Sequence, residues 1–190
     1  MHESVVIDTP RLRLRQWRDS DYPHFAAMNA DPRVMEHFPA PLDRSASDAF
    51  AERLRAEIAE RGWSFWALEL REGEGCFAGF TGLRVPVAQL PFGPCVEIGW
   101  RLAAPHWGKG HASEAASAAL AHGFEVLGLD EIVSFTALPN LRSQAVMRRI
   151  GMRHDGEIFE HPNVAPGHRL RPHCLYRLRR EDWKAQGRAR

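Results

Sequence analysis

Residues 105–114 read PHWGKGHASE, and they stand between an apolar, strand-like run at 95–102 and an alanine-rich helical stretch at 112–127. A glycine-rich turn at a helix start is suited to phosphate, because the first helical turn leaves its backbone N–H groups unpaired at the positive end of the dipole. Glycine also lets a ligand approach the backbone closely. We therefore expect a pyrophosphate to bind along Gly108, Lys109, Gly110, His111, Ala112 and Ser113.

The spacing of these glycines excludes two common phosphate sites. A P-loop needs four residues between its first glycine and Gly-Lys-Ser/Thr, and the dinucleotide fingerprint needs G-x-G-x-x-G. The run G-K-G-H-A-S fits neither pattern. An ordinary exposed loop is the other interpretation of a Gly-Lys-Gly turn, so the turn alone does not decide.

Length and composition indicate a single domain over residues 1–190. The 190 residues are 44% hydrophobic and 26% charged, which suits one compact core. The net charge of +1 gives no field that would attract nucleic acid. No basic segment precedes an apolar run at the start, and no apolar run approaches the roughly 18 residues of a membrane span, so we expect a cytoplasmic protein without a membrane partner.

Cysteine and histidine spacing gives no sign of a metal site. Cys76, Cys95 and Cys174 are widely spaced, which predicts free and mostly buried thiols. The chain has ten histidines but no H-E-x-x-H motif, and those at positions 161, 168 and 173 lack ligand spacing. We therefore expect no metal.

Hydrophobic periodicity predicts an α/β protein with a mixed sheet. The expected strands are 5–15, 63–70, 76–83, 95–102, 132–136, 152–159 and 173–178. The expected helices are one that runs through Tyr22 and Met28 and is ended by Asp31-Pro32, and those at 45–61, 112–127 and 141–150. Asp19 or Ser20 is expected to cap the first helix, and Ser45 or Ser47 the second. A right-handed crossover through helix 112–127 makes strands 95–102 and 132–136 parallel.

The segment from the strand through W-G-K-G-H-A to the helix resembles motif A of the GCN5-related N-acetyltransferases (GNAT). In that family a Gln/Arg-x-x-Gly-x-Gly/Ala signature binds the pyrophosphate of acetyl-CoA. Trp107, Gly110 and Ala112 occupy the signature positions here. Trp107 departs from the usual Gln or Arg, which removes one side-chain contact and leaves the backbone cradle.

Further segments resemble the RimJ/RimL-like branch of that family. They are TPRLRLR at 9–15, EIGW at 97–100, PNLRSQAVMRRIGM at 139–152 and LYRLRREDW at 175–183. The predicted order of elements is also similar, so the resemblance extends over residues 8–183. It implies the GNAT fold, with about seven strands, about four flanking helices and two splayed central strands.

The resemblance also implies how acetyl-CoA binds. Pantetheine would fill the gap between the splayed strands and bond to the backbone of Gly99, Trp100, Arg101 and Leu102, while residues 107–113 hold the pyrophosphate. Lys109 either adds charge near the phosphates or is merely exposed. Asn140 is expected to cap its helix, and the resemblance adds a contact with the CoA arm.

Two residues are candidates for proton transfer. Glu97 lies in an otherwise apolar strand, and the resemblance places E-I-G-[aromatic] beside the active site, which favours a base over an outward-facing glutamate. Many family members use a tyrosine as acid toward the thiolate, but Met147 stands at that position. Ser143 is either a substitute hydrogen-bond donor or an ordinary helix serine.

These features predict an acetyl-CoA-dependent N-acetyltransferase that works by direct transfer in a ternary complex. The acceptor is a protein N-terminal α-amine or a small-molecule amine, selected by residues 28–43 and 160–173. Asp31, Glu36 and Glu160 either attract a cationic amine or are simply solvated. The alternative is a non-catalytic module that senses acetyl-CoA or CoA, and a homodimer is left open.

Overall fold

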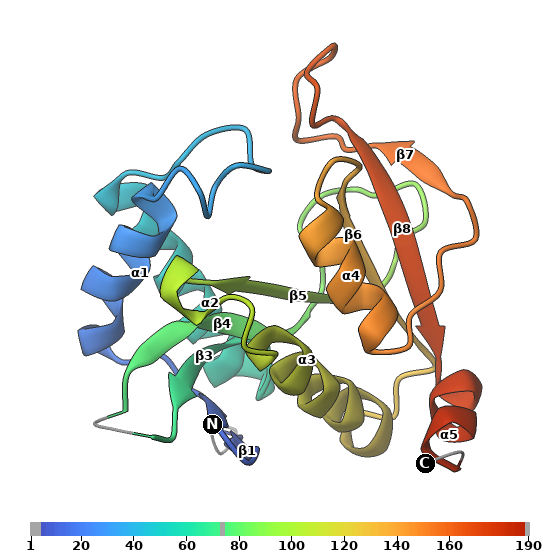
Figure 1. Cartoon of the computed structure of the whole chain (residues 1–190), viewed down its shortest axis with the longest axis horizontal. Coiled ribbons are helices and arrows are strands. Elements are labelled where there is room, and N and C mark those ends of the chain that lie inside the picture. Colours follow the sequence, from blue (N-terminus) through green and yellow to red (C-terminus); the bar gives the residue numbers. More distant parts are fainter. Residues whose placement is uncertain (1–4, 73–74, 189–190) are drawn as a thin grey trace.

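The eight strands form one sheet in the order β1-β2-β3-β4-β5-β6-β8-β7 (Figure 1). The structure is a computed structural model that describes residues 5–72 and 75–188. The strands are β1 (Ile7–Asp8), β2 (Leu12–Arg15), β3 (Phe65–Leu70), β4 (Phe77–Arg84), β5 (Glu97–Leu102), β6 (Glu131–Ala137), β7 (Ile158–Glu160) and β8 (Pro172–Arg179). The helices are α1 (Tyr22–Ala30), α2 (Arg44–Arg61), α3 (His111–Ala121), α4 (Leu141–Arg149) and α5 (Arg180–Arg188).

The sheet opens between β5 and β6. These strands are parallel, as predicted, and share a single registered pair, Glu97 with Val133. The Ser134 hydroxyl donates to the carbonyl of Ile98 at 3.0 Å, just beyond that pair. Toward their carboxyl ends the two strands are no longer paired, so the splayed gap expected from the family resemblance is present.

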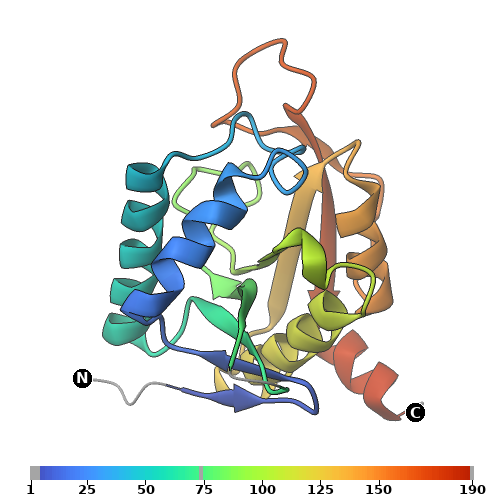
Figure 2. The ribbon, with the colours of Figure 1, turned by 60° about the vertical axis from the view of Figure 1, so that its left-hand side comes forward.

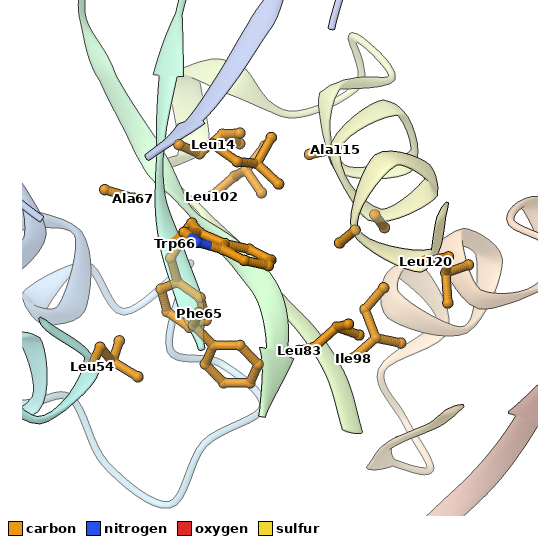
Figure 3. Close-up of a cluster of buried hydrophobic side chains, with 14 of the residues drawn as sticks. Leu14, Leu54, Phe65, Trp66, Ala67, Leu83, Ile98, Leu102, Ala115 and Leu120 are labelled. Atoms are coloured by element: carbon orange, nitrogen blue, oxygen red, sulfur yellow. The ribbon is translucent and has the colours of Figure 1, made fainter. Parts of the chain in front are cut away.

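Helices cover both faces of the sheet. Helices α1 and α2 lie together on one face, and α3 packs against β4 and β5 on the other (Figures 1 and 2). Because side chains alternate along a strand, Ile98 and Leu102 point toward α3, where Ala115 and Leu120 meet them (Figure 3). Odd-numbered residues of β5 therefore face α1 and α2.

The predicted first strand is two strands joined by a tight turn. β1 and β2 pair antiparallel, with Ile7 opposite Leu14. Thr9 closes the turn, since its backbone N–H donates to the carbonyl of Leu12 at 2.9 Å. Pro10 has no N–H for a strand ladder, which explains why the strand is interrupted there.

The helix starts differ from the prediction. A 3₁₀ turn at Asp19–Asp21 precedes α1, which has no side-chain cap. Asp21 binds Arg15 at 2.7 Å instead of serving as a cap. In α2 the cap is Asp43, whose carboxylate accepts from the backbone of Ala46 at 2.7 Å, so the serine caps were wrong.

The later part of the chain has one helix more than predicted. The expected helix 112–127 ends as α3 at Ala121 and continues as a π-helical turn, His122–Val126. The expected strand 152–159 is reduced to β7 and an isolated bridge between Arg153 and Arg177. Helix α5 was not predicted, and its Trp183 packs on Phe124 with ring centroids 5.4 Å apart.

Two further expectations concern burial. Cys174 is buried, but Cys95 is only partly buried and Cys76 is exposed, so mostly buried thiols were wrongly predicted. Within residues 5–72 and 75–188, no helix has both the length and the apolar character required to cross a bilayer.

Candidate active site

A cavity of about 1030 Å³ lies at the splay between β5 and β6. It is bounded by the turn before α3, by α4, by the segment between α1 and α2, and by the segment between β7 and β8. It brings together the predicted site residues Glu97, Gly99, Trp100, Arg101, Leu102, Trp107, Gly108, Gly110, His111, Ala112, Ser113, Asn140 and Ser143. Lys109 is exposed and does not line it.

The turn before α3 presents free backbone donors. Gly108 and Gly110 have φ values of 73° and 81°, which few residues other than glycine adopt. Helix α3 has no side-chain cap, and within the described residues the N–H groups of residues 108–113 donate to no protein acceptor. A side chain at Gly108 would meet nothing within 4 Å, so the turn is open to a ligand. These features fit a bound diphosphate.

An ion-paired clamp fixes the shape of this turn. Arg11 donates through Nη1 to the carbonyl of Lys109 at 2.9 Å and through Nε to the carboxylate of Glu114 at 2.6 Å. The Thr9 hydroxyl donates to the same carboxylate at 2.7 Å. The T-P-R segment and the glutamate after the glycines, which the sequence showed as separate motifs, are thus one structural unit.

Helix α4 brings two arginines to the turn. The Arg142 guanidinium lies over the Trp107 ring, 4.8 Å from its centroid, and Arg149 donates to the Ser113 hydroxyl at 3.2 Å. Trp107 itself donates through its indole N–H to the carbonyl of Leu102 at 2.8 Å. Sequence reasoning missed both arginines, because nothing local to α4 marks them as neighbours of the glycine turn.

Strand alternation decides which backbone groups of β5 face the gap. The N–H of Ala103 donates to Ala78 on β4 at 3.0 Å, and the carbonyl of Gly99 accepts from the Thr81 hydroxyl at 2.9 Å. The backbone groups of Gly99 and Arg101 therefore point to β4, and those of Trp100 and Leu102 point to the gap. The Leu102 carbonyl already accepts from Trp107. Of the backbone groups predicted to bind pantetheine, those that face the gap without a protein partner are the N–H and carbonyl of Trp100 and the N–H of Leu102.

Glu97 lines the cavity, contrary to the outward-facing alternative. Burial raises the pKa of this carboxyl to about 7, although nearby Arg84 lowers it and Glu57 raises it. Arg84 is committed to Glu57 at 2.8 Å, so it does not neutralise Glu97 fully. A carboxyl with such a pKa changes its protonation near neutral pH, as a general base must.

The start of α4 contributes Asn140 and Ser143. The side-chain oxygen of Asn140 accepts from the backbone of Ser143 at 3.1 Å, so the predicted helix cap is confirmed, and its amide donates to Thr136 at 2.9 Å. Ser143 is partly buried and lines the cavity. Met147 is fully buried in the core. Tyr22, Tyr176 and the three cysteines do not line the cavity.

Both segments expected to select the acceptor reach the cavity. The segment between α1 and α2 contributes Val34, His37 and Phe38, and the segment before β8 contributes residues that include His161 and His173. The two latter rings are 4.7 Å apart, and burial lowers the pKa of His161 to about 4. These histidines were not predicted as site residues. No group of three or more metal-ligating side chains occurs in the described part of the chain.

Comparison with known proteins gives consistent matches. A family model for the acetyltransferase (GNAT) domain matches residues 11–153. YnaD, an uncharacterized N-acetyltransferase of Bacillus subtilis, is 30% identical over 179 residues, which cover 93% of this chain and 98% of YnaD. The FsC-acetyl coenzyme A-N(2)-transacetylase of Aspergillus fumigatus is 32% identical, covering 94% of this chain and 77% of its own.

Solved structures match the fold as well. The crystal structure of an acetyltransferase from Agrobacterium tumefaciens has a TM-score of 0.73 and 28% identity, covering 94% of this chain and 96% of that one.

Proposed function

This chain belongs to the GNAT family of acetyltransferases, which use acetyl-CoA. We propose that it acetylates a primary amine by direct transfer in a ternary complex. The observation that carries the proposal is one cavity that joins the open glycine turn to Glu97. Donor and acceptor can then meet without a covalent intermediate. The absence of cysteine from the cavity lining supports this route.

Acetyl-CoA would bind with its pyrophosphate on the N–H groups of residues 108–113. Arg142 and Arg149 add positive charge at this turn, in place of the side chain that Trp107 does not supply. Pantetheine would lie along β5 and bond to the free backbone groups of Trp100, beside Asn140. Because the coenzyme would be bound mainly through backbone groups, few side chains in this region need to be of one particular type.

Glu97 would remove the proton that the amine must lose. A free alkylamine is mostly protonated near neutral pH, with a pKa of about 10.4, and only its neutral form attacks a carbonyl. One proton passes from the ammonium to Glu97, directly or through water, and the neutral amine then attacks the carbonyl carbon. As the C–S bond breaks, the second N–H proton passes to the thiolate, directly or through water, so that the products are the amide and the CoA thiol. An N–H of β5 that faces the gap, at Trp100 or Leu102, would stabilise the oxyanion.

Ser143 would assist the departing thiolate. Its hydroxyl lies at the first turn of α4 on the cavity wall, where a hydrogen bond to sulfur is feasible. Met147, buried in the core, has no proton to give. A thiol with a pKa near 8.5 is already a fair leaving group, so a weak donor is sufficient.

The acceptor is a protein N-terminal α-amine or a small-molecule amine. The RimJ/RimL-like segments favour the first. The name of the Aspergillus relative describes transfer to an N(2) position, which is compatible with either.

Thiol release with a panel of amines tests this function. We expect acetyl-CoA to bind in calorimetry, and free thiol and acetylated amine to form together. Binding without turnover on any amine or N-terminal peptide would contradict the enzymatic proposal. That result would favour a CoA-sensing module, for which the missing acid at Met147 is the supporting feature.

A further inference from the structure

Arg101 places a positive charge on the acceptor side of β5. Its side chain faces α1 and α2, opposite to Leu102, which packs toward α3 (Figure 3). The guanidinium carbon lies 4.1 Å from the centroid of Phe38 and 5.4 Å from that of Phe80. Nη1 donates to the side chain of Asn29 at 2.7 Å. The charge is therefore held rigidly at the cavity wall.

This guanidinium has no anionic partner in the described part of the chain. No carboxylate lies within ion-pairing distance of it, and its Nε is buried without a hydrogen-bond acceptor. Burial lowers the pKa of Arg101 to about 10, so the group remains charged at neutral pH. A buried cation without a counter-ion is costly unless a ligand supplies the charge.

Carboxylates that would suit a cationic acceptor are occupied or lie elsewhere. Asp31 pairs with Arg33 at 2.7 Å, and Glu160 pairs with Arg171 at 2.7 Å. Neither acid lines the cavity, nor does the exposed Glu36, and among the described residues Glu97 is the only acidic one that does. The arginines lining the same cavity are Arg33, Arg101, Arg142 and Arg149. Arg33 is paired with Asp31, and Arg142 and Arg149 lie at the glycine turn, so Arg101 is the cation that an acceptor would meet.

The acceptor face of β5 carries a carboxyl and a guanidinium with a gap between them. Glu97, Gly99 and Arg101 alternate on this face, and the two outer Cα atoms are about 13 Å apart at the usual strand rise. A side chain at Gly99 would collide with Phe65 at 2.8 Å, so the Phe65 ring lies against the strand between Glu97 and Arg101. The site offers an acid at one end, an aromatic floor and a cation at the other end.

We propose that the acceptor is a primary amine that also carries a carboxylate, and that Arg101 binds this carboxylate while the amine lies near Glu97. The inference rests on the proposed acetyl transfer and names its substrate class. The carboxylate supplies the missing counter-ion to the guanidinium. Free amino acids and peptide N-termini with an acidic side chain are the two sources of such an amine.

Matched pairs of amines test this class. Each amino acid is compared with its amide, in which a neutral group replaces the carboxylate, and lysine with cadaverine, which lacks it. Peptides beginning with Asp or Glu are compared with those beginning with Asn or Gln. We expect kcat/KM for at least one carboxylate member to exceed that of its neutral partner by about tenfold to a hundredfold. The source is identified by which pair shows the larger ratio.

The variant Arg101→Gln separates binding from a structural role. If Arg101 binds the carboxylate, Arg101→Gln lowers the ratio of kcat/KM between the carboxylate member and its neutral partner toward one, mainly by raising KM for the carboxylate member. Arg101→Lys should recover part of this ratio. Acetyl-CoA affinity remains near that of the wild type, because the guanidinium lies on the other face of β5 from α3. The control is Arg153→Gln, an exposed arginine outside the cavity, which leaves the ratio unchanged.

A measurement on the wild type covers the case in which Arg101→Gln does not fold. A carboxylic acid that lacks the amine should compete with the acceptor, whereas its amide should not. Equal rates within all pairs, an unchanged ratio in folded Arg101→Gln, or no competition by the acid would overturn the inference. Those results would contradict the substrate class and not the proposed acetyl transfer. Absence of thiol release with every amine would contradict the proposed function.

Discussion

The pKa of Glu97 depends strongly on the surroundings of its side chain. As a free carboxyl it would be ionised well below neutral pH, but burial raises its pKa to about 7. The neighbouring cation does not reverse this, because Arg84 is engaged by Glu57. The group is therefore half protonated near neutral pH, where its protonation state can control the rate.

The pH profile of Glu97→Gln tests its role as base. A base acts in its deprotonated form, so kcat/KM of the wild type should rise with pH and level off above an inflection near 7. An unperturbed carboxyl would already be ionised by about pH 6. In Glu97→Gln the inflection should vanish and the rate should fall about 10²- to 10⁴-fold. Unchanged acetyl-CoA binding in calorimetry serves as the control, and an unchanged profile would exclude Glu97 as the base.

At the scale of elements, the glycine turn depends on the first hairpin. Arg11, next to β2, holds the carbonyl of Lys109 and the carboxylate of Glu114 together. The turn itself contains two glycines in left-handed conformation, which the chain can leave easily. The bonds from Arg11 therefore hold the glycine turn in one conformation.

Removal of this clamp should weaken acetyl-CoA binding. In Arg11→Met the side-chain hydrogen bonds to residues 109 and 114 are lost, while the backbone N–H of residue 11 still donates to Glu114, so the N–H groups of the turn are less well aligned. We expect the Kd for acetyl-CoA to rise about threefold to thirtyfold, from the usual worth of bonds to charged groups in partly exposed positions. Arg13→Met, which removes an exposed pair with Asp8, is the matched control. Equal Kd values for the two variants would exclude the clamp from coenzyme binding.

The order and type of most elements could be predicted, but some of their ends could not. The end of α2 at Arg61 agrees with the predicted helix 45–61, and Gly62 beyond it has the left-handed conformation, φ 85°, that glycine adopts readily. The start of α2 was not predicted, because several polar residues could cap it and only the fold determined that Asp43 does. Helix α5 was missed because its stability comes from Trp183 packing on Phe124, a contact between distant segments.

The candidate site was predictable where its residues are close in sequence. The glycine turn, Glu97 and the Asn140 cap lie in local patterns, and the structure brings them to one cavity. Arg142 and Arg149 could not be assigned to the turn, because their position depends on how α4 packs beside α3. The side chain of Arg101 gave no signal either, since only the fold shows that it lacks a counter-ion.

At the scale of the whole molecule, the sheet consists of two parts joined by few bonds. β5 and β6 share one registered pair, and helix α3, which packs on β4 and β5, also contacts α4, which packs on β6. A ligand that bonds along β5 and contacts α4 would connect the two parts. Binding should thus stabilise the molecule as well as occupy a site.

Hydrogen exchange and thermal unfolding measure this effect. At an acetyl-CoA concentration of about 100 times Kd, the free energy of unfolding should rise by about 2.7 kcal/mol. Exchange should slow at the N–H groups of residues 100, 102 and 108–113, which have no protein acceptor or face the gap. Strand β3 lies between β2 and β4, and its N–H groups serve as the internal reference. A rise in melting temperature without protection at the turn would contradict the placement of the pyrophosphate.

The bond between Thr9 and Glu114 joins residues 105 positions apart in the chain. During synthesis on the ribosome the hairpin is therefore made 105 residues before its partner. Closing so long a loop costs entropy that only later contacts return. The proposed coenzyme site is therefore completed only after helix α3 has left the exit tunnel, and acetyl-CoA could stabilise a nascent chain only from that point on.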